Sequence, residues 1–290
     1  MAYVDLHIHS NKSDDAEFSI REIVEMCAEK KMRRISITDH NSVKGVAEAI
    51  KLGQKSNMDV ISGIEIDCVN NNETNFHLLG YMIDYKRKEF LEIEESIFKQ
   101  EMNSASEKIY KFKKYTGIPL DEKEIYDKSE GEIISGELIA EVVLTKEYAG
   151  KYQILKPYLK GGSRSDRPYV NFYWDFFAQG KPAYVKINFI SLGDAISLVK
   201  STGGVPVLAH PGQNLKNDFS QLDNIIGQGI EGIEAFSSYH SREASEYFYK
   251  KALENNLIVT CGSDFHGKTK PDIKIGDCNL TIDESMILNV

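Results

Sequence analysis

The chain has 290 residues, of which 41% are hydrophobic and 27% charged, and its formal net charge is −9. This length fits either two average domains or one large α/β barrel, and the composition is that of an ordinary globular protein. The negative charge argues against a broad surface for nucleic acid or membrane, so an anionic substrate must be met locally by metal ions or by a few basic side chains.

The cysteines indicate a reducing compartment. Cys27, Cys68, Cys261 and Cys278 are widely separated and show no C-x-x-C spacing, so we expect reduced thiols in a cytoplasmic protein. The first residues lack the basic and apolar regions of a signal peptide, and no uncharged apolar run approaches the length of a membrane span. We therefore expect no membrane association.

The first part of the chain alternates between strand and helix patterns. A capping box, Ser19-Ile20-Arg21-Glu22, opens the first helix. Alternation of this kind favours a parallel α/β fold. The predicted elements are a strand at 3–6, a helix at 19–31, a strand at 34–38, a helix at 43–55, and strands at 59–65 and 75–81.

The alternation stops between about residues 87 and 181 and then resumes. Patterns at 89–115 and 133–148 predict helices, with glycine-containing polar segments around them. We interpret residues 98–181 as a mainly helical insertion that caps a barrel formed by residues 1–97 and 182–290. The later elements are predicted as strands at 183–187, 205–209, 229–236 and 257–261, and helices at 192–201, 219–227 and 242–255.

Histidines and acidic residues gather at the predicted strand ends. His7 and His9 share one face of a strand, because side chains alternate with a period of two. In parallel barrels, functional groups collect at the carboxyl ends of the strands, so residues far apart in sequence converge there. The residues in such positions are His7, His9, Asp14, His40, Glu65, His77, His210, Asp264 and His266.

Mixed imidazole and carboxylate ligands suit Mn²⁺, Fe²⁺, Zn²⁺ or Co²⁺ better than Mg²⁺ or Ca²⁺. Nine ligands exceed the needs of one or two ions, and three divalent ions are plausible if one carboxylate bridges two of them. Such a centre can generate hydroxide near neutral pH and stabilise charge on phosphoryl oxygens. The residues therefore predict a multinuclear metal hydrolase.

Six motifs, taken together, resemble those of the PHP (polymerase and histidinol phosphatase) family. This resemblance implies a distorted (β/α)₇ barrel with a trinuclear metal centre in the phosphoesterases. Ser13-Asp14 and the segment 182–185 are similar to the branch of nucleotide and nucleoside-bisphosphate phosphatases. The motifs are His7-Ile8-His9-Ser10, Thr38-Asp39-His40-Asn41, Gly63-Ile64-Glu65, His77, Ala209-His210-Pro211 and Ser263-Asp264-Phe265-His266.

The resemblance also implies how the ligands are divided among the ions. One ion would be held by His7, His9, Glu65 and Asp264. Glu65 would bridge to a second ion, held also by His77 and His210. A third ion would be held by Asp14, His40 and His266. We expect Glu65, Asp264 and His266 to be catalytic as well as metal-ligating, and Asp39 to orient the imidazole of His40.

The insertion departs from the family pattern. Relatives often carry an Arg-Pro-His-type segment that contributes to substrate binding, and this chain has Ser135-Gly136-Glu137 at that place. Arg164 and Arg167 are candidates for the missing cations, because a guanidinium group matches phosphate oxygens in a bidentate way. Lys186 and His240, each just after a predicted strand, are further candidates for substrate contacts.

The leading hypothesis is a phosphoesterase in which metal hydroxide attacks the phosphate of a small metabolite, a nucleotide or nucleoside 3′,5′-bisphosphate foremost, and releases inorganic phosphate. Histidinol-phosphate phosphatase and 5′–3′ exonuclease on short RNA are alternatives. The overall acidity disfavours long nucleic acid. A non-catalytic PHP module is a fourth reading, disfavoured because every ligand position is filled. The sequence does not indicate an oligomeric state.

Overall fold

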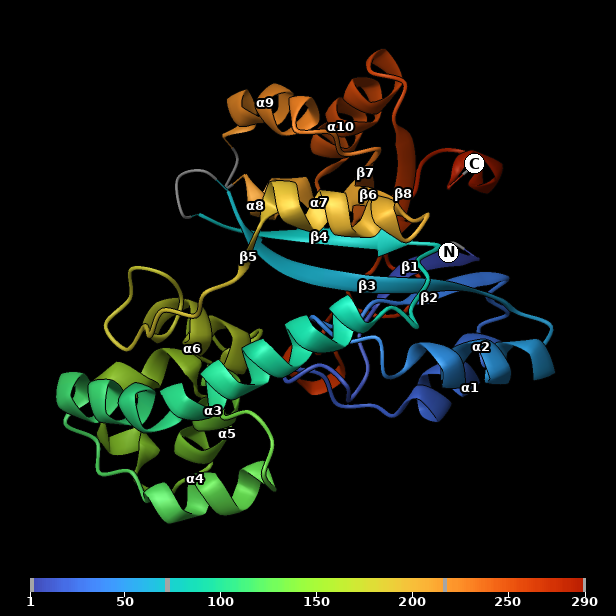
Figure 1. Ribbon diagram of the computed structural model, residues 1–290. Helices are drawn as coiled ribbons and strands as arrows, with labels where there is room; N and C mark the ends of the chain where they lie inside the picture. The colour runs from blue at the N-terminus through green and yellow to red at the C-terminus, as the bar shows by residue number, and fades with distance from the viewer. Residues whose placement is uncertain (1–2, 71–73, 216–217, 289–290) are drawn as a thin grey trace.

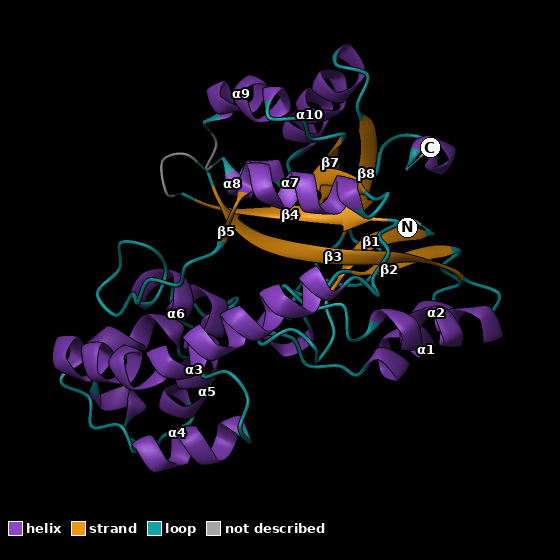
Figure 2. Ribbon diagram, in the orientation of Figure 1, coloured by secondary structure: helices purple, strands orange, loops and turns teal. Residues whose placement is uncertain are grey.

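The computed structural model describes residues 3–70, 74–215 and 218–288. A strongly curved sheet forms one half of the molecule and a group of helices forms the other (Figures 1 and 2). The sheet order is β1-β2-β3-β4-β6-β7-β8, with short β5 paired to β3. The strands are β1 Val4–Ile8, β2 Arg34–Ile37, β3 Asp59–Val69, β4 Asn75–Tyr81, β5 Ile190–Ser191, β6 Val205–Leu208, β7 Gly232–Ser237 and β8 Ile258–Gly262.

The sheet is a nearly closed, distorted barrel. Its neighbouring strands are parallel except at β4, which runs antiparallel to both β3 and β6. Beyond the end of β8, the backbone N–H of Asp264 donates to the carbonyl of His7 at 2.8 Å, and that of His9 donates to the carbonyl of Phe265 at 3.0 Å. These bonds join the last strand to the first, which confirms the barrel fold predicted from the sequence.

Helices cover the outside of the barrel. The predicted capping box is present at the first of them, where Ser19 and Glu22 bond reciprocally. Buried apolar side chains fill the space between the helices and the sheet, with Leu6, Ile64 and Leu78 fully buried in the barrel core. The helices are α1 Ile20–Glu29, α2 Val46–Lys55, α7 Leu192–Ser201, α8 Pro211–Asn214, α9 Leu222–Gly227 and α10 Arg242–Glu254.

The remaining helices form a cap beside the sheet, at the lower left of Figure 1. It has a core of its own, in which Phe112, Phe172 and Phe176 pack together. The long helix α3 enters both halves, because Phe90 near its start belongs to the barrel core. The expected boundary at residue 98 therefore falls inside α3. The cap helices are α3 Lys88–Thr116, α4 Glu122–Ser129, α5 Gly136–Leu144 and α6 Pro168–Phe176, with 3₁₀ turns at Ala149–Lys151 and Gln153–Tyr158.

Two predictions within or beside the cap were wrong in detail. Residues 183–187 form no strand, and the helix expected at 133–148 is limited to α5. Helices α4 and α6 were not predicted. Ala183 is buried in the cap core and its N–H donates to the carbonyl of Phe176, so the apolar residues of this segment pack against helices rather than into a sheet.

In the part of the chain that the structure describes, no helix is both long and apolar enough to cross a membrane. The four cysteines, Cys27, Cys68, Cys261 and Cys278, are buried free thiols.

Candidate metal centre

Six of the seven histidines meet at one end of the barrel. They come from β1 and its following loop, from the loops after β2, β6 and β8, and from within β4, and their rings lie in mutual contact. The convergence follows from the parallel strands, whose carboxyl ends share one edge. The six are His7, His9, His40, His77, His210 and His266.

The first group of ligands lies deepest. The Nε2 atoms of His7 and His9 are 3.0 Å apart, and both are 3.1 Å from Oε2 of Glu65. Oδ1 of Asp264 lies 3.1 Å from Nε2 of His9 and 3.3 Å from Nε2 of His7. All four side chains are essentially excluded from solvent. Two nitrogens and two oxygens thus point at one small volume, as ligands of a transition-metal ion do.

The other oxygen of Glu65 belongs to a second group. Oε1 lies 3.0 Å from Nδ1 of His77 and 3.1 Å from Nε2 of His210. A carboxylate whose two oxygens face different imidazole sets is arranged to bridge two ions. The ligand division expected from the sequence places these residues in its second group, and it stays a prediction.

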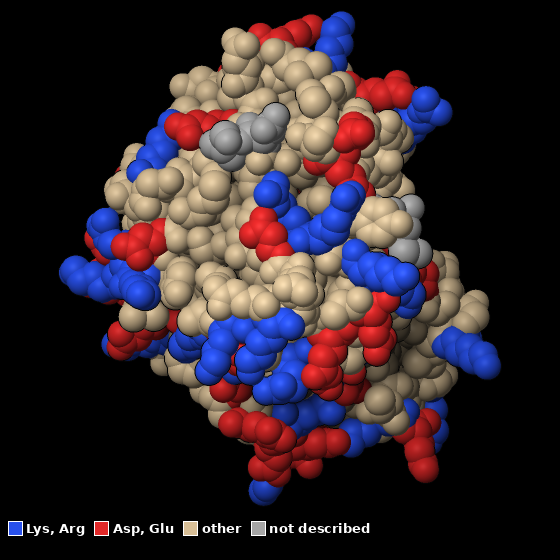
Figure 3. All heavy atoms as spheres, turned by 90° about the vertical axis from the view of Figure 1, so that its right-hand side faces the viewer, with Lys and Arg blue, Asp and Glu red and all other residues tan. Residues whose placement is uncertain are grey.

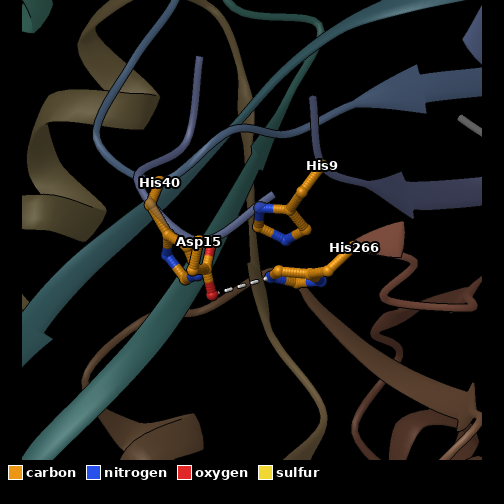
Figure 4. A group of neighbouring side chains, drawn as sticks. All are labelled: His9, Asp15, His40 and His266. Carbon is orange, nitrogen blue, oxygen red and sulfur yellow. Dashed lines mark ion pairs between the residues drawn. The ribbon is translucent and has the colours of Figure 1, made fainter. Parts of the chain in front are cut away.

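The third group contains a different aspartate from the one expected (Figure 4). His9, Asp15, His40 and His266 bring their ligand atoms within 4.8 Å of one another, and Oδ2 of Asp15 lies 3.1 Å from Nε2 of His266. Asp14 instead lines the adjoining cleft. The side chains of these two adjacent aspartates point in different directions, so one carboxylate faces the histidines and the other faces the cleft.

The protonation states of these carboxyl and imidazole groups favour the binding of divalent cations. Although burial opposes it, the imidazoles of His7, His40 and His77 hold the pKa of Glu65 well below its usual range. Burial and the imidazoles of His266 and His40 lower the pKa of His9 to about 4. Against the effect of burial, Glu65 and two further carboxylates raise the pKa of His7, and a bound metal ion would take the place of that proton. The donor set therefore fits transition-metal ions.

Neighbouring side chains fix the orientation of the imidazoles. Nδ1 of His7 lies 3.0 Å from Oε1 of Glu234, and Nδ1 of His266 lies 2.9 Å from the carbonyl of Asp264. Nδ1 of His9 lies 3.0 Å from Oγ of Ser13. Each contact leaves Nε2 to face the centre, as is usual for metal-bound histidines. Glu234 was not predicted, although a fully buried carboxylate in an apolar strand is a strong signal.

Asp39 has a different partner from the one expected. Its carboxylate accepts hydrogen bonds from the N–H and Oγ of Ser10 and from Oγ of Ser13, at 2.6, 2.8 and 3.3 Å. Because Ser13 also contacts Nδ1 of His9, Asp39 supports His9. The predicted support of the His40 imidazole is wrong: Nδ1 of His40 lies 3.1 Å from Oδ1 of Asp67.

Asp67 is a further acidic residue that the sequence interpretation missed. It lies two residues after Glu65 on β3 and so points to the same face. Oδ2 accepts from the side-chain N–H of Asn41 at 2.8 Å, while Oδ1 faces His40 and lies 3.5 Å from Nε2 of His77. Asp67 thus forms a fourth possible ligand group with His40 and His77.

A cleft of about 680 Å³ lies between the metal centre and the cap. Its walls combine carboxylates, lysines and apolar side chains, a mixture typical of a pocket for a small ligand. The residues that line it include Lys12, Asp14, His40, Lys44, Asp67, Ile97, Phe98, Glu101, Lys128, Glu132, Leu138 and Phe189.

The four expected substrate contacts are not among the residues that line this cleft. Arg164 makes a bidentate ion pair with Asp175, with both N–O distances 3.0 Å, and Arg167 makes one with Asp272, with both distances 2.6 Å. Lys186 is exposed.

His240 is buried and bonded through both ring nitrogens. Nδ1 lies 3.0 Å from the carbonyl of Ala235, and Nε2 accepts from the N–H of Gly212 at 3.1 Å. These contacts support a structural role for His240, because neither nitrogen is left to bind a substrate.

Comparisons with known proteins give a family match and several relatives. The model of the PHP domain family matches residues 5–181. The chain is 24% identical over 265 residues to a phosphoribosyl 1,2-cyclic phosphate 1,2-diphosphodiesterase from Eggerthella lenta, covering 91% of this chain and 94% of that one. It is 26% identical over 272 residues to a 3′,5′-nucleoside bisphosphate phosphatase from Chromobacterium violaceum, covering 92% and 88%.

Two further similarities cover most of the chain. A 5′–3′ exoribonuclease from Haemophilus influenzae is 23% identical over 268 residues, covering 90% of this chain and 89% of that one. Among solved structures, an amidohydrolase from Chromobacterium violaceum superimposes with a TM-score of 0.74 at 24% identity, covering 91% and 88%. The latter supports the fold alone.

Proposed function

Because this chain belongs to the PHP domain family and is a metal-dependent phosphoester hydrolase, we propose that it removes phosphate from a small phosphorylated metabolite, a nucleotide or nucleoside 3′,5′-bisphosphate foremost. The observation that carries the proposal is Glu65, whose two oxygens face separate sets of histidines. We propose three ions, of Mn²⁺, Fe²⁺ or Zn²⁺, as occupants of the three groups.

The ligand assignment belongs to the same proposal. His7, His9, Glu65 and Asp264 hold one ion, and Glu65, His77 and His210 hold the second. His40, His266 and Asp15 hold the third, with Asp15 in the place first assigned to Asp14. When bound, these ions polarise phosphoryl oxygens and activate water.

The chain contributes orientation and charge balance. Glu234 and Ser13 hold two imidazoles with Nε2 directed inward, which prevents the rings from turning away. Glu65 and Asp264 remain ionised and buried, so they attract cations strongly where water cannot screen the charges. The cap forms the opposite wall of the cleft and limits the size of the substrate.

The names of the three relatives guide the choice of substrate. Each name describes a compound in which phosphate is esterified to ribose. Phe98 and Phe189 line the cleft, and aromatic rings of this kind can stack on a nucleobase. These features support a nucleotide-like substrate with the reacting phosphate at the metal centre and the base toward the cap.

Histidinol phosphate is a second candidate, favoured by the acidity of the cleft. Asp14, Asp67 and Glu101 line it. Such a wall attracts an ammonium group and repels a second phosphate.

Short RNA is a third candidate, supported by the exoribonuclease relative. Long nucleic acid fits less well, because the chain carries a formal net charge of −9. On the one face drawn in Figure 3, basic and acidic side chains are interspersed. A non-catalytic role is disfavoured, since every expected ligand group is complete once Asp15 is counted.

The test is a phosphate-release screen of metal-loaded protein. The panel contains nucleotides, nucleoside 3′,5′-bisphosphates, histidinol phosphate and short oligoribonucleotides, each measured with Mn²⁺ and after chelation. We expect the highest kcat/KM on a nucleotide or bisphosphate. Preference for histidinol phosphate would select the second candidate, and the absence of hydrolysis of every compound would refute the proposal.

A further inference from the structure

Lys270 places a positive charge in the wall of the metal centre. The binding of metal ions does not explain this charge. It follows the short 3₁₀ turn Gly267–Thr269, and its side chain is 12% exposed. Nζ lies 2.6 Å from Oδ2 of Asp264 and 3.4 Å from Nε2 of His266. It also lies 5.5 Å from the centre of the Tyr239 ring. An ammonium group so close to two metal ligands needs a reason, because it opposes the binding of cations.

The two oxygens of Asp264 separate Lys270 from the first ligand group. Oδ1 faces the Nε2 atoms of His7 and His9, whereas Oδ2 accepts from Lys270 and from the hydroxyl of Tyr239. Lys270 therefore stands on the far side of this carboxylate from the first group. There it adjoins the third group through His266.

The contact with His266 depends on whether a metal ion is present. Nδ1 of His266 is engaged with the carbonyl of Asp264, so Nε2 is the atom left for a metal ion. An ammonium group has three N–H donors, and Asp264 accepts one of them. Once an ion occupies Nε2, the donor now directed at His266 has no acceptor there. That donor can then bind an oxygen of a ligand held beside His266.

We propose that Lys270 binds a phosphoryl oxygen of the substrate beside the third ligand group, and so makes the site selective for phosphate esters. The proposal rests on the phosphoesterase function proposed above. Lysine is a common phosphate ligand, acting as a point charge. This role also fits the burial of the ammonium group, because a buried charge is costly unless a partner of opposite charge compensates it, and a bound phosphate would add such a partner.

The main competing explanation is that Lys270 only holds Asp264 in place. Tyr239 provides the means to separate the two roles, because its hydroxyl donates to the same Oδ2 atom. Tyr239→Phe removes one support of Asp264 and keeps the ammonium group. Lys270→Met removes the charge and keeps most of the length and apolar surface of the side chain.

The experiment compares wild-type protein, Lys270→Met, Lys270→Arg, Tyr239→Phe and Lys274→Met after loading with Mn²⁺. Lys274 is the matched control, since it is an exposed lysine of the same segment whose Nζ contacts the carbonyl of Pro271. Three quantities are measured on each protein: metal content per chain, the dissociation constant of inorganic phosphate by calorimetry, and kcat and KM on the best phosphomonoester.

We expect Lys270→Met to keep its metal content and to bind inorganic phosphate about 10- to 100-fold more weakly, the loss of one charged hydrogen bond. Lys270→Arg should recover part of the affinity, and Lys274→Met should match wild type. Unchanged phosphate affinity in Lys270→Met would overturn the proposal. So would a loss of metal shared by Lys270→Met and Tyr239→Phe, which would assign Lys270 to the support of Asp264. Wild-type protein that hydrolyses no phosphoester would instead refute the proposed function.

Discussion

Replacing Glu65 with glutamine tests the metal centre at its most connected residue. The carboxylate is completely buried and has five imidazole nitrogens within 3.4 Å. Glutamine has nearly the same shape, but it has no charge and one end becomes an N–H₂ donor. That donor would face imidazole nitrogens on one side, so one of the two ions loses its oxygen ligand outright.

The expected magnitude follows from the burial of the group. Removing one partner of a buried charge interaction costs about 3–5 kcal/mol, because the remaining charge is left without compensation. For metal binding, this corresponds to a loss of affinity of about two to four orders of magnitude. One ion loses an oxygen ligand, and because Glu65 faces two ligand groups, the loss of its charge should weaken the binding of both ions. Replacing a single histidine, such as His77→Ala, should affect only one.

The assay is the metal content of Glu65→Gln after dialysis against graded metal buffers, together with kcat/KM on the best substrate. Glu246→Gln is the matched control, because Glu246 is exposed and pairs with Arg242 four residues before it. We expect the control to retain full metal content. Near-normal turnover and metal content in Glu65→Gln would show that Glu65 does not bridge two ions.

Three further predictions concern the same centre. Asp15→Asn should lower the affinity for one ion by at least about tenfold while Asp14→Asn leaves it unchanged; the reverse order in calorimetric metal titrations would return the ligand role to Asp14. Glu234→Gln should weaken metal binding by about 10- to 100-fold through His7, and metal titrations at several pH values should show the loss throughout. Removal of the ions by a chelator should abolish phosphate release and Mn²⁺ should restore it; full activity of the metal-free protein would contradict the mechanism.

The fold and most of the centre could be predicted because many strands in the sequence are followed directly by a candidate metal ligand. Short apolar runs that end in histidine or a carboxylate identify both the strand and the edge at which it ends. Parallel strands then bring those ends together without any knowledge of loop conformation. His7, His210 and Asp264 are separated by up to 257 positions, yet their convergence needed only the order of the strands.

Other features depended on conformations that no local pattern reveals. Asp14 and Asp15 are equivalent in sequence, and only the path of their loop brings Asp15 to His266. Residues 183–187 have the alternation of a strand, but they pack on the cap, whose core the sequence did not reveal. Arg164 and Arg167 look like free cations in a polar loop until their carboxylate partners are known. Tertiary contacts decided each of these positions.

Charge balance connects the number of ions to the substrate. The possible ligands include four carboxylates, those of Asp15, Glu65, Asp67 and Asp264, whose four negative charges two divalent ions would only neutralise. A third ion leaves the centre with a net charge of about +2 before Lys270 is counted, while a phosphate monoester is close to a dianion at pH 7 because its second pKa is about 6. The proposed centre with three ions would therefore attract this substrate strongly. Local positive charge of this origin would let a chain with a formal net charge of −9 bind an anion.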